Sequence, residues 1–208
     1  MDVKAPPPPR RRTLRAERAA LTRSRITDAA RRLFRLQGYG ATTLQAVADE
    51  AGVAVQTVYA VFTSKAGILR ELREALVHQP EAERLFGAAL VADEPRQRLT
   101  QFAQSIRVRW AAGGDIVLIY QEAASTDLTL RAELDAVLAR RRGGISRLAE
   151  ALAGSIRPGL APTAAAAILD ALTLPDVYAE LSGVHGWTPE AFEAWLTNAL
   201  CRELLETP

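Results

Sequence analysis

Two short amphipathic segments joined by a glycine turn constrain the fold of this chain more than any other feature. Four apolar residues recur at helical spacing between positions 44 and 51, and Gly52, the residue best suited to a left-handed helix end, follows them. A second helical segment, Val55–Phe62, begins after only two more residues. This is the layout of a helix-turn-helix, whose second helix enters the DNA major groove.

The start of the first short helix has two candidate caps. Thr42 and Gln45 have the spacing of a capping box, and Thr43 is the alternative N-cap. In a capping box the amide of Gln45 is engaged with the backbone, whereas with Thr43 as the cap it is free to reach a base. Both assignments predict a helix that ends at Gly52.

The remainder of the chain also follows helical periodicity. A helix is predicted from about Thr22 to Gly38, and Ser64 is placed to cap a longer helix that ends near His78, before Pro80. The pattern stays helical beyond Pro80, and no alternating strand pattern persists, although the β-rich run 116–120 is ambiguous. We therefore predict an all-α fold of about nine to ten helices, with later segments at 95–112, 115–124, 127–155, 162–183 with a break at Pro175, and 189–206.

Charge is distributed unevenly along the chain. Residues 1–75 carry 14 Lys+Arg against 7 Asp+Glu, whereas residues 76–208 carry 12 against 17. A basic first third predicts a head that binds a polyanion, joined to a body that does not. Residues 1–21 contain four consecutive prolines and three consecutive arginines, and we expect a disordered basic arm that either supplements phosphate binding or acts as a solubilising tail.

Several function classes lose support from the composition. The single cysteine, Cys201, and two distant histidines predict neither a disulfide nor a metal site. No apolar run approaches the roughly 20 residues of a membrane helix, so we expect a cytoplasmic protein without a membrane partner. The phosphate-binding, zinc-protease and serine-hydrolase motifs are absent, which argues against an enzyme and predicts no cofactor.

The region around the glycine turn resembles a known DNA-binding domain. The stretch Gly38-Tyr39-x-x-Thr42-Thr43-Leu44-x-x-Val47-Ala48-x-x-Ala51-Gly52-Val53-x-x-x-Thr57-Val58-Tyr59-x-x-Phe62-x-Ser64-Lys65-x-x-x-Leu69 is similar to that of the tetracycline-repressor (TetR) family. The resemblance implies a DNA-binding domain at 22–69, a linking helix to about residue 78, and a helical ligand-binding and dimerisation domain at 80–208. It also implies a homodimer on a palindromic operator in double-stranded DNA.

The resemblance and the residue chemistry assign candidate DNA contacts. Gln56 has the amide to read an adenine edge, and apolar groups on its helix suit thymine methyls. Tyr59 and Lys65 are candidates for phosphates, although Tyr59 also suits a core position and Lys65 a solvated helix start. Ala54 lacks the hydroxyl common in the family, which removes one helix cap. The predicted DNA-binding residues are Thr43, Gln45, Val55, Gln56, Thr57, Tyr59, Val61 and Lys65.

A candidate effector site lies in the second domain. Apolar and aromatic side chains recur on one face of the segment 95–112, which is typical either of plain core or of a cavity in a helical bundle. The predicted ligand-binding residues are Phe102, Ile106, Trp110, Tyr120 and His78. Because few charges fall among them, we expect an apolar or aromatic ligand. Residues 140–142 are three consecutive arginines, and we expect them to form a solvated face.

These features predict a ligand-responsive homodimeric DNA-binding regulator, a repressor that a small molecule releases from its operator. A regulator of the same architecture that responds to a protein partner, or to no effector, is the alternative. A soluble helical enzyme is the third hypothesis, and no sequence motif favours it.

Overall fold

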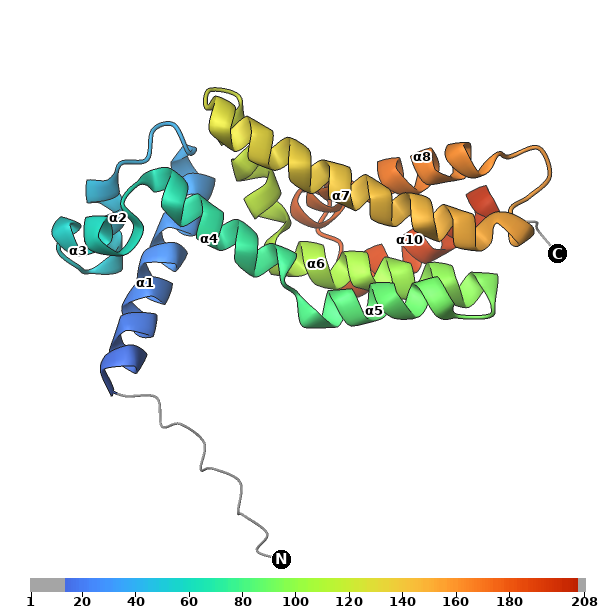
Figure 1. The fold of residues 1–208 in the computed structure, drawn as a ribbon, viewed down its shortest axis with the longest axis horizontal. Coiled ribbons are helices and arrows are strands. Elements are labelled where there is room, and N and C mark those ends of the chain that lie inside the picture. The colour runs from blue at the N-terminus through green and yellow to red at the C-terminus, as the bar shows by residue number, and fades with distance from the viewer. Residues whose placement is uncertain (1–13, 206–208) are drawn as a thin grey trace, which may run out of the picture.

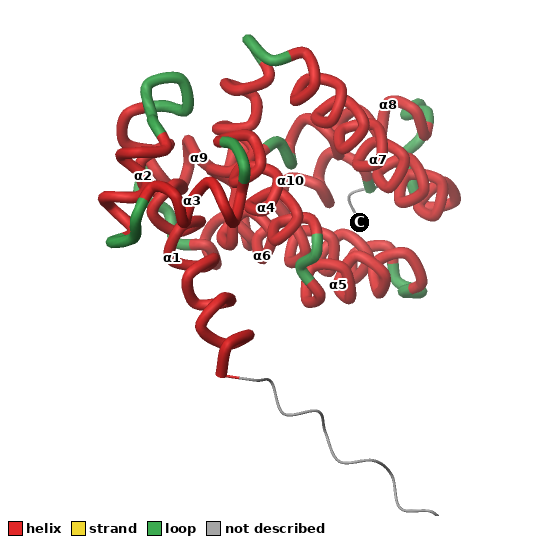
Figure 2. Tube along the Cα trace, turned by 60° about the vertical axis from the view of Figure 1, so that its left-hand side comes forward, coloured by secondary structure: helices red, strands yellow, loops and turns green. Residues whose placement is uncertain are grey.

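The computed structural model describes residues 14–205, and this part of the chain consists of helices joined by loops, without a β-strand (Figure 2). It contains ten α-helices, so the prediction of an all-α fold is confirmed. The molecule is elongated, with a small N-terminal head at one end and a helical body at the other (Figure 1).

The head consists of α1 (Leu14–Gln37), α2 (Leu44–Ala51), α3 (Val55–Phe62) and α4 (Lys65–Val77). Its core forms because each helix contributes one apolar stripe, including Ile26, Phe34, Val47, Val58 and Leu69, all nearly inaccessible to solvent. Helix α4 leaves the head and continues along the body, where it packs against α6 (Figure 1).

Helix α1 begins at Leu14, eight residues before the predicted start at Thr22. The expectation of disorder is therefore wrong for residues 14–21, and residues 1–13 lie outside the described range. Alanine, leucine, arginine and glutamate dominate this segment and are strong helix formers, so the helix extends without burying an apolar face. The hydroxyl of Thr22 donates to the Arg18 carbonyl within this helix, at 3.0 Å.

The body contains six further α-helices and two short irregular turns. Helix α5 packs along α6, α7 packs against α6 and α8, and α10 packs against α6. A 3₁₀ turn, Ala153–Ser155, follows α7, and a π turn, Glu180–Val184, follows α9. The bounds are α5 (Pro80–Val91), α6 (Pro95–Ala124), α7 (Leu128–Leu152), α8 (Pro162–Leu172), α9 (Pro175–Ala179) and α10 (Pro189–Leu204).

Helix α6 joins two segments that were predicted to be separate. It is continuous except at Gly113, whose φ of −173° and ψ of 34° produce a kink. A Cβ at Gly113 would lie 2.8 Å from Ile116 Cδ1 and 3.1 Å from Leu76 Cδ1, so the glycine allows α4 to approach the kink closely. The ambiguous run 116–120 is helical, and the predicted break at Pro175 separates α8 from α9.

Candidate nucleic-acid interface and internal cavity

The turn between α2 and α3 has well-defined caps. The Thr43 hydroxyl accepts the Ala46 N–H at 3.1 Å, so Thr43 is the N-cap of α2. The alternative capping box is wrong, because the Thr42 hydroxyl is buried and donates to the Gly38 carbonyl at 2.7 Å. Gly52 ends α2 in the left-handed region, with φ of +63°, which is the predicted conformation.

Helix α3 presents a polar outer face above a buried inner one. Val58 is fully buried, whereas Gln56 is exposed and Tyr59 is 54% exposed, which excludes Tyr59 from the core. Val55, Thr57 and Val61 are half-buried, and the two valines pack against the core, so they expose less surface than predicted. As expected from Ala54, no side chain caps the start of α3.

Gln45 lies on the exposed side of α2. Its amide donates to an Asp49 carboxylate oxygen at 2.8 Å rather than to the backbone. An exposed pair of this kind holds the amide weakly, because water competes for both groups. The surface formed by Thr43, Gln45, Gln56 and Tyr59 therefore combines neutral hydrogen-bonding groups from α2 and α3.

Lys65 lies at the start of α4, and its side chain contacts the loop that precedes α2. Its ammonium donates to the carbonyls of Tyr39 at 2.5 Å, Gly40 at 3.2 Å and Thr42 at 2.9 Å. These three bonds use all three donors of the group. It also lies 4.3 Å from the centroid of the Tyr39 ring, and its pKa is lowered by burial. Lys65 is thus occupied in holding the loop that precedes α2, and a phosphate would have to displace these carbonyls.

The junction between α3 and α4 is tight. Thr63 has φ of +61° and ψ of −39°, and the following Ser64 N–H donates to the Phe62 carbonyl. The Ser64 hydroxyl then caps α4 by accepting the Gly67 N–H at 3.1 Å, as predicted. A Cβ at Gly67 would overlap the Phe62 carbonyl oxygen. Backbone geometry therefore fixes the angle between the two helices.

Two carboxylates on the second half of α6 bind the head to the body. Asp115 accepts from Arg31 Nε at 2.9 Å and from Arg31 Nη2 at 2.5 Å. About two turns further on, Glu122 accepts the N–H groups of Tyr39 at 3.1 Å and Gly40 at 3.2 Å. The part of α6 that follows the kink at Gly113 thus contacts both α1 and the loop before α2.

A polar cluster also links α4 to α6 and α7. The Glu133 carboxylate on α7 accepts from Arg70 Nε at 2.9 Å, from Arg73 Nη1 at 2.9 Å and from the Tyr120 hydroxyl at 2.5 Å. Burial opposes ionisation of Glu133, but these hydrogen bonds and the two guanidinium charges outweigh it and lower its pKa. Burial and the bond to Glu133 raise the pKa of Tyr120, so its hydroxyl remains a donor.

The body contains a cavity of about 430 Å³, partly open to solvent, between the end of α4, α5, α6 and α7. The predicted residues Phe102, Ile106 and Trp110 line it. Tyr120 lines a smaller neighbouring cavity of about 80 Å³, which shares Trp110 with the larger one. His78 is not among the residues that line these cavities: α4 ends at Val77, and the exposed imidazole faces Glu74 and Glu83 at 3.4 and 3.9 Å.

Arginines that the sequence analysis missed also line the larger cavity. They come from α6 and α7, and Glu83 is the one acid among the described lining residues. The expectation that few charges lie inside is therefore wrong. Helical spacing gave a signal, because Arg109 follows Ile106 by three positions and so shares its face. The four are Arg109, Arg140, Arg141 and Arg147.

Arg141 is half-buried rather than part of a solvated face. It forms an ion pair with Asp170 and donates to the Thr173 carbonyl at 3.0 Å, the same oxygen that accepts the Trp110 indole N–H at 3.0 Å. The prediction for residues 140–142 is thus wrong at position 141, because α8 covers that side of α7. Arg140 and Arg142 are exposed.

Within the described residues, no helix combines the length and apolarity needed to cross a bilayer. In the same range, no three His, Cys, Asp or Glu side chains are grouped as metal ligands.

Comparison with protein families identifies the head. Residues 26–72 match the model described as bacterial regulatory proteins of the tetR family. The chain carries a TetR-family DNA-binding domain. This match contains α2 and α3 whole and confirms the resemblance found in the sequence. A comparison with curated proteins gave no match.

Solved structures extend the similarity of fold to the body. NalD of Pseudomonas aeruginosa, described as the secondary repressor of the MexAB-OprM multidrug efflux pump, is 23% identical with a TM-score of 0.69, over 91% of this chain and 98% of that one. A SmeT–triclosan complex is 19% identical with a TM-score of 0.67, over 89% and 92%. Bacillus subtilis FadR in complex with stearoyl-CoA is 20% identical with a TM-score of 0.66, over 86% and 98%. At these identities the similarity shows the fold of TetR-family regulators.

Proposed function

We propose that this chain is a ligand-responsive homodimeric transcriptional repressor that acts in the cytoplasm and has no catalytic activity. Residues 22–69 bind a palindromic operator, and residues 80–208 bind a small effector with an apolar or aromatic body and form the dimer. One observation carries the proposal: the cavity lies against Leu76 and Val77, the end of the helix that begins in the DNA-binding head.

On DNA, the outer face of α3 enters the major groove. Gln56 hydrogen-bonds a base edge, and Val55, Thr57 and Val61 offer smaller apolar contacts. Tyr59 and Thr43 contact phosphates on either side of the groove, and Gln45 reaches the groove edge once it leaves Asp49. Lys65 acts indirectly, by shaping the loop that places Thr43.

The dimer forms through the C-terminal helices α8 and α10, as the family resemblance implies. A twofold axis there places two α3 helices on the same side of the assembly. Half-sites one turn of B-DNA apart require these two helices to lie about 34 Å from each other. Effector binding releases DNA by favouring an arrangement with a different spacing. A coupling of about 1–3 kcal/mol gives partial release, and a near-complete switch needs roughly 5.5 kcal/mol.

The cavity favours an effector over a protein partner. Its volume of about 430 Å³ lies within the usual range for small-molecule sites. Two proteins of similar fold are described as complexes with triclosan and with stearoyl-CoA, both of which have large apolar parts.

Binding selection on randomised duplexes tests the DNA-reading role. We expect the wild-type chain to select a palindrome and to bind it as two chains per duplex, measured by sedimentation. Gln56→Ala should change the preferred base at one position in each half-site, whereas Tyr59→Phe should weaken binding to every sequence to a similar extent. Gln97→Ala, an exposed glutamine on α6, is the matched control. An unchanged preference in Gln56→Ala, or one chain per duplex, would contradict the proposal.

A further inference from the structure

We propose that the effector is an amphipathic anion, an apolar molecule with one carboxylate or similar acid group, and that Arg109 binds this group. Arg140 and Arg147 flank the site. The inference rests on the proposed role of the cavity as the effector site. It adds the chemical class of the ligand, which the apolar and aromatic lining residues alone do not specify.

The arginines of the cavity differ in how they are neutralised. Arg141 has its own carboxylate, Asp170, and three further oxygen acceptors from α8 and the residue after it. Arg109, Arg140 and Arg147 form no ion pair with any described residue. Arg109 donates only to the backbone carbonyls of Leu76 and Val77, both at 3.3 Å. The cavity therefore has more cationic groups than its own acids neutralise.

Arg109 is the arginine for which an anion matters most. Its guanidinium is partly buried, and this burial lowers its pKa even though the charge of Glu83 acts in the opposite direction. A buried cation without an anionic partner is costly, and neutral carbonyls compensate it less well than a carboxylate. The charges of Arg109 and Arg141 repel each other, but Arg141 is paired with Asp170, so Arg109 is the one left without an acid.

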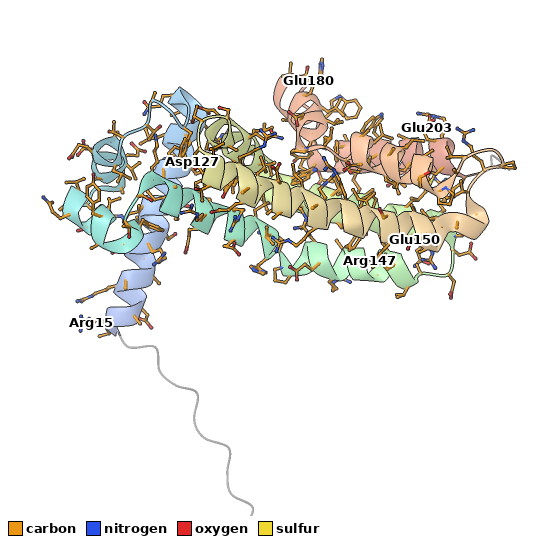
Figure 3. All side chains as sticks on the ribbon, turned by 45° about the horizontal axis from the view of Figure 1, so that its top comes forward. Arg15, Asp127, Arg147, Glu150, Glu180 and Glu203 are labelled. Carbon is orange, nitrogen blue, oxygen red and sulfur yellow. The ribbon has the colours of Figure 1, made fainter. Side chains whose placement is uncertain are left out.

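Arg140 and Arg147 place further positive charge around the same cavity. They lie one turn on either side of Gly144 on α7, and a Cβ at Gly144 would lie 3.4 Å from the Phe86 ring of α5. Arg147 lies on the part of α7 nearest α5 in Figure 3. Both arginines are exposed and so can attract an anion from solvent before it is buried.

The apolar part of the cavity suits the other end of such a ligand. Its walls are aromatic and aliphatic side chains of α5, α6 and α7, and Arg109 stands among them. These side chains are Phe86, Phe102, Ile106, Trp110, Val117, Val137 and Ile145. An anion with an apolar body therefore satisfies both halves of the site, whereas a small inorganic anion leaves the apolar half empty.

The position of Arg109 also connects recognition to the head. Its two carbonyl partners belong to the last residues of α4, whose other end is fixed to α3 by the Thr63 junction. An acid group bound to the guanidinium competes with these carbonyls. Binding of the charge thus acts on the end of the helix that positions the DNA-binding domain.

Calorimetric titration of the full-length protein with decanoate and with decanamide tests the charge requirement. The two probes have the same apolar chain, and only decanoate is charged. We expect decanoate to bind at least about tenfold more tightly than decanamide, as expected for a charge-assisted hydrogen bond. Arg109→Gln, and the double variant Arg140→Gln/Arg147→Gln, should remove most of this difference without weakening decanamide. Arg131→Gln, an exposed arginine on α7 outside the cavity, should bind both probes as the wild type does.

A further variant distinguishes loss of charge recognition from misfolding of the arginine variants. Glu83→Gln removes the one acid of the lining and should tighten decanoate binding by a few-fold, which a damaged cavity would not do. Equal binding of the two probes, or no tightening in Glu83→Gln, would overturn the inference. If decanamide alone binds and releases operator DNA, the proposed function stands, but the inference that the effector is an anion is wrong. If neither probe binds and no neutral compound releases DNA, both are wrong.

Discussion

Replacement of Asp115 by asparagine tests how the head is held on the body. Asp115 accepts two hydrogen bonds from Arg31, and Arg31 Nη2 also donates to the Ala112 carbonyl at 3.0 Å. The two charged side chains are only 31% and 23% exposed. A charge-assisted bond is typically worth about 1.5–3 kcal/mol, and partial exposure places this pair near 2 kcal/mol.

The expected change in melting temperature follows from this energy. For a chain of this size each kcal/mol corresponds to roughly 2–4 °C, so Asp115→Asn should melt about 4–8 °C lower. Scanning calorimetry at one fixed protein concentration measures it, because dimerisation makes the midpoint depend on concentration. Asp135→Asn, whose ion pair with Arg131 is well exposed, should change little.

A double-mutant cycle with Arg31→Gln separates the pair from its surroundings. We expect a coupling energy of about 1–2 kcal/mol, because removal of either partner already abolishes the interaction. A coupling energy near zero, or a midpoint for Asp115→Asn equal to that of the control, would refute the argument that this pair fixes the head.

Three further substitutions test other parts of the structure by urea denaturation. Thr63→Gly should raise the free energy of unfolding by about 1 kcal/mol, because φ of +61° strains a β-branched residue; a loss of stability would contradict that reasoning. Gly67→Ala should cost about 3 kcal/mol or more, since its Cβ would overlap the Phe62 carbonyl, whereas Gly87→Ala on α5, with open space around it, should be neutral or stabilising. Glu133 has a lowered pKa in the folded state, so its stabilisation is present above its ordinary pKa of 4.5 and is lost as the pH falls through the folded value. Glu133→Gln should therefore be less stable than wild type at pH 7 and lose less on acidification; parallel profiles of the two proteins would argue against the cluster.

The sequence by itself determined the DNA-binding head. Periodic apolar residues and the glycine at position 52 specify α2, the turn and α3 through short-range interactions, so their bounds were predicted closely. The exposure of Tyr59 followed for the same reason, because its position on the helix places it away from the buried face. Local signals also gave the Ser64 cap and the break at Pro175.

The tertiary structure decided how these parts are joined and what the cavity contains. Lys65 binds three carbonyls of a loop that is distant in sequence, and periodicity carries no information about such partners. Arg109 and Arg147 meet at one cavity only because α6 and α7 pack side by side. Helical patterns specify which face of a helix is apolar, whereas the neighbour that covers that face depends on contacts between residues far apart in the chain.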